Sequence, residues 1–571
     1  MAYSTITLGS GTFQLTFTFD SKVLSTPIYI VWWITSNFFC TLYKLLRSPD
    51  GNTVYHAVCY FSGFILLRAI IILNWTTLSL IPGPLVSKLF YKSLIYYKIK
   101  GTLHQHILRQ HQKYGQVVRL GPEQVYITNP SDWKHILSSS YEYPKRIPPD
   151  NSVFGPPLNT LAIHDSKEHG IRRILVDPAY TTTYIKAMEK IILDTGPMRL
   201  KSKIDEEICF SKEQSRPAKI NHANVFNYMS LDVFGKLGFD EDFGMLDTCN
   251  DTILEGIKAV EFIYMLENYS PFLAKYKKRL FPWIVKKYDT FLLFIKNIVD
   301  ERMKGLKWNN NKPFRRDILQ VFIDAVDPET NRFMNKGQII SESLLHLVKG
   351  PKSTSSTLSW TLFLLMVYPI TYRKVCYEIR SAFPDKSKPI TYTEGLSKLS
   401  YLEAILLESM RFIPASVTSI SRKITKPGLK LVSGHILPSG TKVKMSIYSI
   451  HHDKKLWKYP HVFSPERFMV NEYSSKQDVD QRKQNLLTFS MGPRACPGHN
   501  LAWCEMFMTL ANLLRDYDFW LPEDMPYGPD VIDEETGQPK IIPGFLAEFT
   551  GYSLKNPQSE GWICVKHNTS I

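Results

Sequence analysis

The sequence predicts a mainly α-helical protein with small β-sheets, joined to an apolar N-terminal segment. Three observations predict this class. Helical periodicity fills long stretches, over residues 252–265, 283–303, 337–368, 401–412 and 498–516. Short alternating strands occur over 116–128, around a Gly-Pro turn, and over 415–450. Two long apolar runs precede residue 80, and the chain beyond residue 100 contains neither a repeat nor a low-complexity linker, so one helical body follows the apolar segment.

The N-terminal segment predicts a membrane anchor. Residues 23–43 carry no formal charge, and a helix of that length can cross about 30 Å of hydrocarbon. A second run, 54–75, is interrupted only by His56 and Arg68, so it could span the bilayer or lie in its interface. A secretory signal peptide is the alternative, although the first run lacks a basic start and a small-residue cleavage site. We expect a tail over 1–22 and an anchor of one or two transmembrane segments over 23–80.

The boundary after the anchor is marked by proline and by charge. The run Ile81-Pro82-Gly83-Pro84 predicts a stiff elbow, because proline fixes φ and removes a backbone donor. A cluster of lysines follows between residues 88 and 100, and such clusters favour the cytosolic side of a membrane. We therefore expect a globular domain over residues 81–571 that faces the cytosol.

Composition excludes several classes of protein. The 571 residues carry a net charge of +16, which suits an anionic membrane face or an acidic protein partner. No basic tract interleaved with aromatic residues occurs, so we expect no nucleic acid partner. The eight cysteines are irregularly spaced without a Cys-x-x-Cys pair. This spacing argues against a disulfide framework and against a structural zinc site, and favours a reducing compartment.

One cysteine lies in a loop suited to binding iron. The segment 489–498 reads Phe-Ser-Met-Gly-Pro-Arg-Ala-Cys-Pro-Gly. A thiolate beneath a flat macrocycle needs a backbone that comes close to the ring, which Gly492 and Gly498 allow. The start of a helix stabilises a thiolate at Cys496. The planar fork of Arg494 can bind a carboxylate of the macrocycle.

The same segment resembles the haem signature of the cytochrome P450 family, Phe-x-x-Gly-x-Arg-x-Cys-x-Gly, at every fixed position. The resemblance implies the cytochrome P450 fold and a haem-thiolate catalytic domain. It implies haem b as cofactor and Cys496 as axial ligand of the iron. Phe489, Gly492, Arg494 and Gly498 are then haem-binding residues. Cys504, on the following helix, has no such context and is expected in the core.

Further motifs in the expected order strengthen the resemblance. Glu408 and Arg411 share one face of a predicted helix, and Pro465-Glu-Arg467-Phe follows before the cysteine loop. The family pairs these three charges in a buried structural triad. The resemblance also places Arg422 and Arg173 at positions that hold haem propionates. The family often has tryptophan four residues before the latter arginine, where this chain has His169.

The central helix departs from the family pattern. Relatives carry Ala/Gly-Gly-x-Asp/Glu-Thr-Thr, in which an acid and a threonine pass protons to bound oxygen. Residues 349–354 read Lys-Gly-Pro-Lys-Ser-Thr. Ser353 keeps a hydroxyl, with Thr354 beside it, and these are the candidate catalytic residues. Lys352 replaces the acid, and Pro351 is predicted to open the helix.

Three interpretations of this departure stay open. In the first, Ser353 does the work of the threonine and Lys352 turns away from haem into a salt bridge. In the second, Lys352 or Lys349 points into the pocket and pairs with an anionic substrate, because a buried unpaired lysine would lose its proton. In the third, the enzyme does not cleave oxygen by the usual route.

The resemblance implies oxygen-dependent hydroxylation of a lipophilic small molecule of sterol, steroid or fatty acyl type. The chain has no nucleotide fingerprint and no flavin domain, so a separate NADPH-cytochrome P450 reductase is expected, with cytochrome b5 as a second candidate donor. Membrane-bound relatives imply the endoplasmic reticulum membrane. A haem-thiolate isomerase, dehydratase or peroxygenase on a lipid substrate is the alternative, and a haem sensor is a third. Expected substrate-facing positions are 147–161, 255–268, His346, Val417 and Thr418. For His346, a hydrogen-bonded place in the core is the alternative.

Overall fold

The computed structural model describes residues 51–74, 76–139, 142–145, 157–249, 251–308, 317–418, 421–425, 428–523, 525–542, 544–547, 551–554 and 556–569. The first predicted membrane stretch, 23–43, and most of the predicted substrate-facing loop, 147–161, lie outside these residues. The second apolar run forms α2 (Gly51–Asn74). None of the helices in the described ranges combines the length and the apolar character needed to cross a membrane.

Helices dominate the body, as predicted. Before the central helix they are α3 (Leu85–Leu89), α4 (Ile95–Ile99), α5 (Leu103–Tyr114), α6 (Pro130–Ser138), α7 (Ser166–Val176), α8 (Thr182–Leu193), α9 (Arg199–Glu213), α10 (His222–Phe239), α11 (Met245–Thr248), α12 (Thr252–Tyr269), α13 (Pro271–Lys275), α14 (Lys277–Leu280), α15 (Pro282–Trp308) and α16 (Ile318–Asp324). From there on they are α17 (Lys336–Val367), α18 (Pro369–Ala382), α19 (Tyr392–Lys398), α20 (Ser400–Phe412), α21 (Ile447–His451), α22 (Lys476–Asn485), α23 (His499–Asp516) and α24 (Pro557–Glu560).

The strands form small sheets at the edges of the helical body. One sheet has the order β1-β2-β7-β4, from β1 (Val117–Arg119), β2 (Gln124–Ile127), β7 (Lys442–Met445) and β4 (Arg422–Lys423). Its β2–β7 pair is parallel, with Val125 opposite Val443, and its other pairs are antiparallel. A second sheet has the order β3-β13-β8, from β3 (Ala218–Asn221), β13 (Trp562–His567) and β8 (Tyr517–Trp520). The remaining pairs are β5 (Leu429–Lys430) with β6 (Ile436–Leu437), β9 (Gly528–Ile532) with β10 (Pro539–Lys540), and β11 (Gly544–Ala547) with β12 (Gly551–Leu554).

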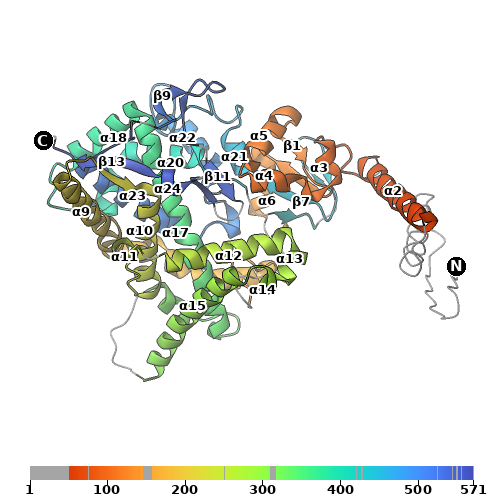
Figure 1. Cartoon of the computed structure of the whole chain (residues 1–571), viewed down its shortest axis with the longest axis horizontal. Coiled ribbons are helices and arrows are strands. Elements are labelled where there is room, and N and C mark those ends of the chain that lie inside the picture. The colour runs from red at the N-terminus through yellow and green to blue at the C-terminus, as the bar shows by residue number, and fades with distance from the viewer. Residues whose placement is uncertain are drawn as a thin grey trace.

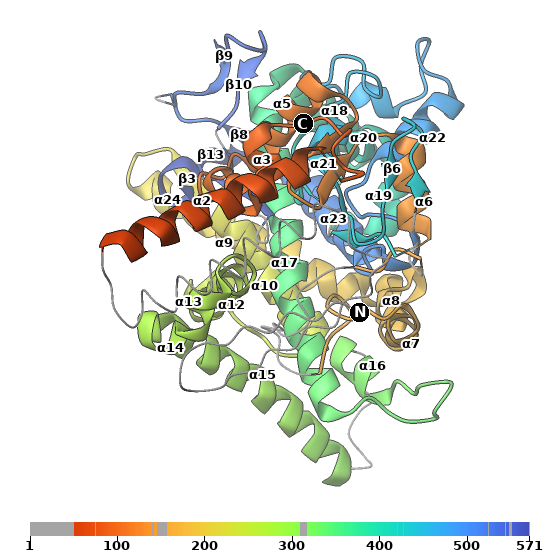
Figure 2. The same ribbon diagram turned by 90° about the vertical axis from the view of Figure 1, so that its right-hand side faces the viewer.

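The central helix α17 passes through the middle of the molecule (Figures 1 and 2). Asn335 and Gln338 form a capping box at its start, and Pro369 follows its end. It packs against α10 on one side and against α20 and α23 on another. Side chains such as Leu358 and Leu364 are fully buried there, so apolar burial fixes the course of this helix.

The prediction that Pro351 opens the central helix was wrong. Pro351 lies inside α17, which is helical without interruption from Lys336 to Val367. Proline removes one backbone hydrogen bond. Packing against α10, α20 and α23 keeps the chain helical at this point. The hydroxyls of Ser353 and Thr354 also donate to carbonyl groups of the preceding turn.

The elbow before the body is a packed joint. The backbone N–H of Arg119 donates to the carbonyl oxygen of Pro82 at 2.8 Å. A Cβ atom on Gly83 would lie 2.2 Å from the carbonyl oxygen of Arg119, so only glycine fits there. The buried guanidinium of Arg119 also donates to the carbonyl of Ile72 in α2, at 3.1 Å. These contacts hold the end of α2 against the sheet, and α2 projects from the body (Figure 1).

Candidate active site

The cysteine loop is closed by its own backbone. The N–H of Cys496 donates to the carbonyl of Phe489 at 2.9 Å, and the N–H of Ala495 donates to that of Gly492 at 2.9 Å. Gly492 has a φ of +73°, and a Cβ atom there would lie 2.4 Å from the carbonyl oxygen of Leu137 in α6. Glycine therefore lets the loop lie against α6. The ring of Phe489 packs on His499, with centroids 4.3 Å apart.

The thiol of Cys496 faces a space inside the protein. The side chain keeps accessible surface, although desolvation by surrounding protein is the largest influence on it and raises its pKa. A side chain that keeps accessible surface although surrounding protein shields it from bulk water borders a space enclosed by the protein. The backbone N–H of Gly498 and the charges of Arg173 and Lys145 lower the same pKa. These groups oppose the effect of burial and favour the thiolate.

Buried cations surround this space. Arg422 is 2% exposed, and its Nε and Nη1 atoms have no hydrogen-bond partner within the described residues. Burial, and then repulsion by Arg494, lower its pKa to about 10. Lys145 is also buried, and its pKa is lowered by burial and then by Arg422, Arg494 and Arg173. Lys145 was not predicted from the sequence, because a single lysine outside any motif gives no signal.

The other two arginines contact the backbone around the cysteine. Arg494 donates to the carbonyl of Ile163 at 2.7 Å and to that of His164 at 3.0 Å. Arg173 donates to the carbonyl of Ala495 at 2.7 Å and pairs with Asp177 at 2.7 Å. Both guanidinium groups therefore link the cysteine loop to the segments before it.

His169 is buried beside these cations. Burial is the largest cause that lowers its pKa, to about 3, followed by the charges of Arg494 and Lys145. The imidazole is therefore neutral at pH 7 and adds no charge to the cluster. Where the family often has an indole, this chain has a neutral ring that can still donate one hydrogen bond.

The cation cluster fits haem. Orphaned buried donors on Arg422 and a surplus of positive charge require an anion. The two propionates of haem supply that charge, and the thiol of Cys496 faces the same space. Phe489, Gly492 and Gly498 shape the loop beneath it. Haem therefore suits the groups that the structure brings together.

Glu408, Arg411 and Arg467 also meet, in a buried ion cluster. Arg411 binds the carboxylate of Glu408 through two nitrogens, at 2.7 and 2.8 Å. The Nε atom of Arg467 lies 3.0 Å from the same carboxylate. The N–H of Ser464 donates to it at 2.9 Å, and Arg411 donates to the carbonyl of His451 at 2.8 Å. The cluster thus joins α20 to the segments that precede the cysteine loop.

The predicted oxygen-side residues lie on α17. The hydroxyl of Ser353 donates to the carbonyls of Lys349 and Gly350, each at 3.2 Å, and its side chain is exposed although α17 crosses the middle of the molecule. Thr354 is buried and donates to the carbonyl of Gly350 at 3.2 Å. Of the two hydroxyls, Ser353 is therefore the one with access to a space. The helix α17 packs against α23, which begins directly after the cysteine loop.

Lys349 and Lys352 both act on the buried carboxylate of Glu261 in α12. Burial raises the pKa of Glu261, and the charges of Lys352 and Lys349 lower it. Glu261 is thus an acid on which the charge of Lys352 acts, and the three interpretations of Lys352 stay predictions. Glu261 was not singled out from the sequence, because a helix face of mixed polarity gives no signal for a single charged partner.

His346 is a bonded core histidine, which was one of the two predictions for it. The hydroxyl of Tyr180 lies 2.7 Å from its Nδ1 atom, and its ring stacks on that of Tyr180. Its Nε2 atom lies 3.6 Å from Glu342, which accepts hydrogen bonds from Thr160 and Arg172. Val417 and Thr418, predicted as substrate-facing, are both buried, and Cys504 is fully buried as expected.

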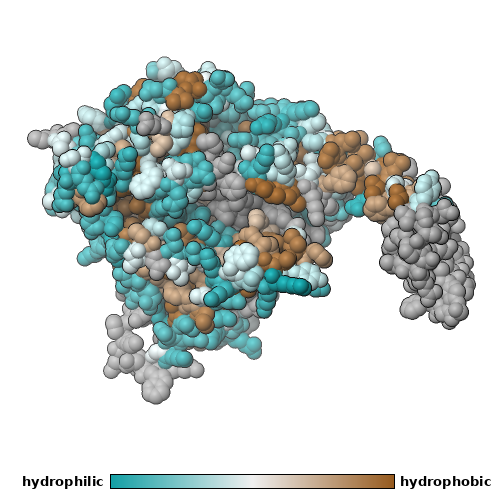
Figure 3. Space-filling view, viewed as in Figure 1, coloured by the Kyte–Doolittle hydropathy of each residue, from teal (hydrophilic) through white to brown (hydrophobic). Residues whose placement is uncertain are grey.

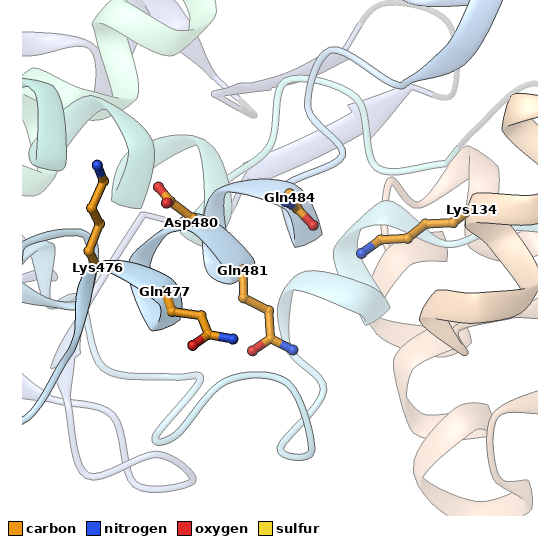
Figure 4. Close-up of a pocket in the computed structure, with 6 residues that line it drawn as sticks. All are labelled: Lys134, Lys476, Gln477, Asp480, Gln481 and Gln484. Carbon is orange, nitrogen blue, oxygen red and sulfur yellow. The ribbon is translucent and has the colours of Figure 1, made fainter.

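A separate hollow of about 630 Å³ lies between α6 and α22 (Figure 4). It is lined by Lys134, Lys476, Gln477, Asp480, Gln481 and Gln484. These side chains are polar or charged, and none of the predicted site residues is among them. The hollow is therefore a surface feature beside the helix that supports the cysteine loop.

Comparison with known proteins decides the family. The family model described as "Cytochrome P450" matches residues 81–535. The chain belongs to the cytochrome P450 family. Cytochrome P450 monooxygenase helB1 of Aspergillus fumigatus is 31% identical over 496 residues, which cover 86% of this chain and 82% of that protein. Cytochrome P450 monooxygenase helB3 of the same fungus is 29% identical over 477 residues, covering 81% of this chain and 88% of that protein.

A third relative, cytochrome P450 monooxygenase apf7 of Gibberella fujikuroi, is 28% identical over 458 residues, which cover 77% of this chain and 85% of that protein. The chain is a cytochrome P450 monooxygenase with a haem-thiolate cofactor, and the family implies a redox partner. The mainly helical architecture with small sheets agrees with this family.

Proposed function

We propose that this cytochrome P450 hydroxylates a lipophilic small molecule of sterol, steroid or fatty acyl type, with O₂ and electrons from a separate NADPH-cytochrome P450 reductase. The observation that carries the proposal is the thiol of Cys496, which faces an internal space beside orphaned buried cations. Haem bound through Cys496 supplies the activation of oxygen, because a thiolate ligand favours O–O cleavage.

The residues around the space have separate tasks. Arg422 and Lys145 would hold the propionates, since their charges are buried and face no acid that offsets them in the described residues. Arg173 and Arg494 fix the cysteine loop through carbonyl groups and add positive charge. The accessible hydroxyl of Ser353 would hold and pass a proton, while that of Thr354 stays bonded within the helix.

Exposed apolar side chains support a place at the endoplasmic reticulum membrane, with the catalytic domain on the cytosolic side. On α2 they include Val58, Phe61 and Leu66, and brown residues cover this projecting helix in Figure 3. On α13 and in α15 they include Phe272 and Trp283. Exposed apolar patches of this kind mark lipid or protein contacts, and a membrane-held enzyme receives lipophilic substrates directly from the lipid phase.

The net positive charge of the chain supports docking of an electron donor with an acidic surface. The cysteine loop lies against α6, and Lys134 of α6 and Lys476 of α22 border the hollow in Figure 4. With a net charge of +16, electrostatic attraction would speed encounter with an acidic surface. NADPH-cytochrome P450 reductase is the proposed donor, and cytochrome b5 is the second candidate.

The proposed reaction is tested with isotopic oxygen. Membranes containing the full chain and a reductase receive sterols, steroids and fatty acids with NADPH and ¹⁸O₂, and products are read by mass. One heavy oxygen per product is the expected result. Product without label, or turnover without NADPH, would instead identify rearrangement or peroxide chemistry.

A further inference from the structure

One buried carboxylate of the central helix holds two other parts of the chain. Glu342 of α17 is fully buried. Its Oε1 atom accepts a hydrogen bond from the backbone N–H of Thr160 at 2.7 Å and another from the hydroxyl of Thr160 at 2.8 Å. The guanidinium of Arg172 in α7 donates to the same oxygen at 2.9 Å and to the carbonyl of Leu158 at 3.1 Å. Glu342 therefore fastens both the segment 158–164 and α7 to α17.

The segment 158–164 also reaches the cysteine loop. Arg494 of that loop donates to the carbonyl of Ile163 at 2.7 Å and to that of His164 at 3.0 Å. The segment is thus bonded to α17 at Thr160 and to the cysteine loop three residues later. Three residues span at most about 11 Å when fully extended, so this short link limits the distance between the central helix and the loop.

The helix α7 forms a second link between the same two elements. Arg172 donates to Glu342, and its neighbour Arg173 donates to the carbonyl of Ala495 at 2.7 Å. One rigid helix thus holds α17 with one arginine and the cysteine loop with the next. The side chains of Arg172 and Glu342 are 4% and 0% exposed, and breaking a buried ion pair leaves an uncompensated charge in the interior. The second link is therefore costly to open.

A third link starts one turn further along α17. The Nδ1 atom of His346 lies 2.7 Å from the hydroxyl of Tyr180, and the two rings stack. The backbone carbonyl of Tyr180 accepts a hydrogen bond from the side-chain amide of Asn500 at 2.9 Å. Asn500 lies in the first turn of α23, directly after the cysteine loop. Three separate links therefore join the start of α17 to residues 494–500.

The same side of α17 carries the candidate proton donor. Eleven residues, or about three turns, separate Glu342 from Ser353, so both side chains leave the helix on one side, about 16 Å apart along its axis. The helix is uninterrupted between them. We infer that Glu342 is a positioning residue, which sets the distance of the Ser353 hydroxyl from the cysteine loop and from haem bound there. This inference rests on the proposed task of Ser353 and names the residue that positions it.

The test uses carbon monoxide as a probe on the reduced, haem-loaded, full-length protein. Infrared spectroscopy reads the C–O stretching frequency, which responds to a hydroxyl dipole beside the bound gas. Ser353→Ala gives the reference frequency without that hydroxyl. The band of Glu342→Gln should move most of the way toward this reference, because Arg172 and Thr160 no longer have the charged carboxylate that holds them to α17.

A double variant separates position from charge. Glu342→Gln also removes a charge, whose field acts on the bound gas by itself. That direct effect would persist in a protein without the Ser353 hydroxyl, whereas the displacement of a hydroxyl that is absent has no effect. The band of the double variant Glu342→Gln with Ser353→Ala should therefore coincide with that of Ser353→Ala alone.

A matched pair at Thr160 keeps the inference testable should Glu342→Gln fail to load haem. Thr160→Val removes the hydroxyl that donates to Glu342 and changes no charge, so the band should move part of the way. Thr160→Ser keeps the hydroxyl and should match the parent. The surface control is Lys167→Met, which breaks an exposed ion pair between α7 and Glu329 at 3.0 Å and should leave the band unchanged.

Two results would overturn the inference: a full shift that remains in the double variant, or no shift in any haem-loaded variant at Glu342 or Thr160. Either result leaves the proposed function intact, provided that Ser353→Ala moves the band. An unmoved band in Ser353→Ala would instead contradict the proposed task of Ser353 and overturn the inference with it. Absence of the thiolate spectrum from the parent protein would contradict the proposed function as a whole.

Discussion

Two buried clusters in this molecule have the same formal composition and opposite character. At α20, Glu408 meets Arg411 and Arg467, and every group is 10% exposed or less. At α17, the charges of Lys349 and Lys352 act on the buried Glu261, and both lysines keep accessible surface. Arginine forks bind a carboxylate in a fixed plane, whereas lysine is a mobile point charge. One carboxylate with two cations thus makes a fixed joint in the first case and an adaptable one in the second.

A third buried glutamate completes the comparison. Glu505 of α23 accepts a hydrogen bond from Ser230, and no cation pairs with it in the described part of the chain. Burial raises its pKa to about 8. The surroundings therefore decide what a buried carboxyl does: two arginines bind Glu408, the charges of two lysines lower the pKa of Glu261, and burial keeps Glu505 neutral although the hydrogen bond from Ser230 opposes this.

The largest expected effect lies at the cysteine of the haem-binding loop. Cys496→Ser should abolish the thiolate spectrum of the reduced carbonyl complex, because serine offers no sulfur ligand. Absorbance spectroscopy on the purified variant checks this. Cys504→Ser, at a buried core cysteine, is the matched control and should retain the spectrum. A thiolate spectrum in Cys496→Ser would mean that the ligand is another residue.

Breaking the fixed cluster should cost stability and haem together. Glu408→Ala leaves two guanidinium groups without their carboxylate, and breaking a buried pair costs about 3–5 kcal/mol. Denaturant unfolding and the ratio of haem to protein measure the two effects. Glu403→Ala on the same helix removes a surface pair with Lys483 and should cost less than about 1 kcal/mol. A fully loaded Glu408→Ala of normal stability would remove the structural role.

Replacing Ser353 should reduce the coupling of NADPH consumption to product formation, rather than the stability of the fold. Ser353→Ala removes the accessible hydroxyl on α17. The amount of product formed per NADPH consumed should therefore fall several-fold, and peroxide should be released instead. Peroxide and product assays under the same NADPH flux measure this. Thr354→Val is the matched variant at a buried hydroxyl and should uncouple less. Greater uncoupling in Thr354→Val than in Ser353→Ala would identify Thr354 as the proton donor.

The smallest expected effect is a pH-dependent gain in the free energy of unfolding when Glu505 is replaced. Its pKa in the folded protein is raised to about 8 from 4.5, so its contribution to stability is complete below about pH 4.5 and is lost as pH rises toward 8. Glu505→Gln cannot ionise and should be more stable than the parent near pH 8, by roughly 1 kcal/mol or more. Thermal unfolding at pH 5 and pH 8 checks this. An equal difference in stability between Glu505→Gln and the parent at both pH values would contradict the raised pKa of Glu505.

Sequence patterns predicted the fixed parts of this molecule better than the adaptable ones. The helices around α17, the strand pair β1–β2 and the meeting of Glu408 with Arg411 and Arg467 follow from periodicity and from motifs. Pro351 was misjudged, because local propensity ignores the packing that keeps α17 helical through this residue. Lys145 and Glu261 were missed, since their importance comes from partners distant in the chain.

The joint at Arg119 has a consequence for engineering the N-terminal segment. Because Arg119 binds both Ile72 of α2 and Pro82 of the elbow, the direction in which α2 leaves the body is encoded by the folded domain. A chimera that exchanges residues before Ile72 should keep this docking angle, whereas one spliced after Gly83 should lose it. The position of the splice, more than the identity of the residues before it, would therefore set the angle between α2 and the body.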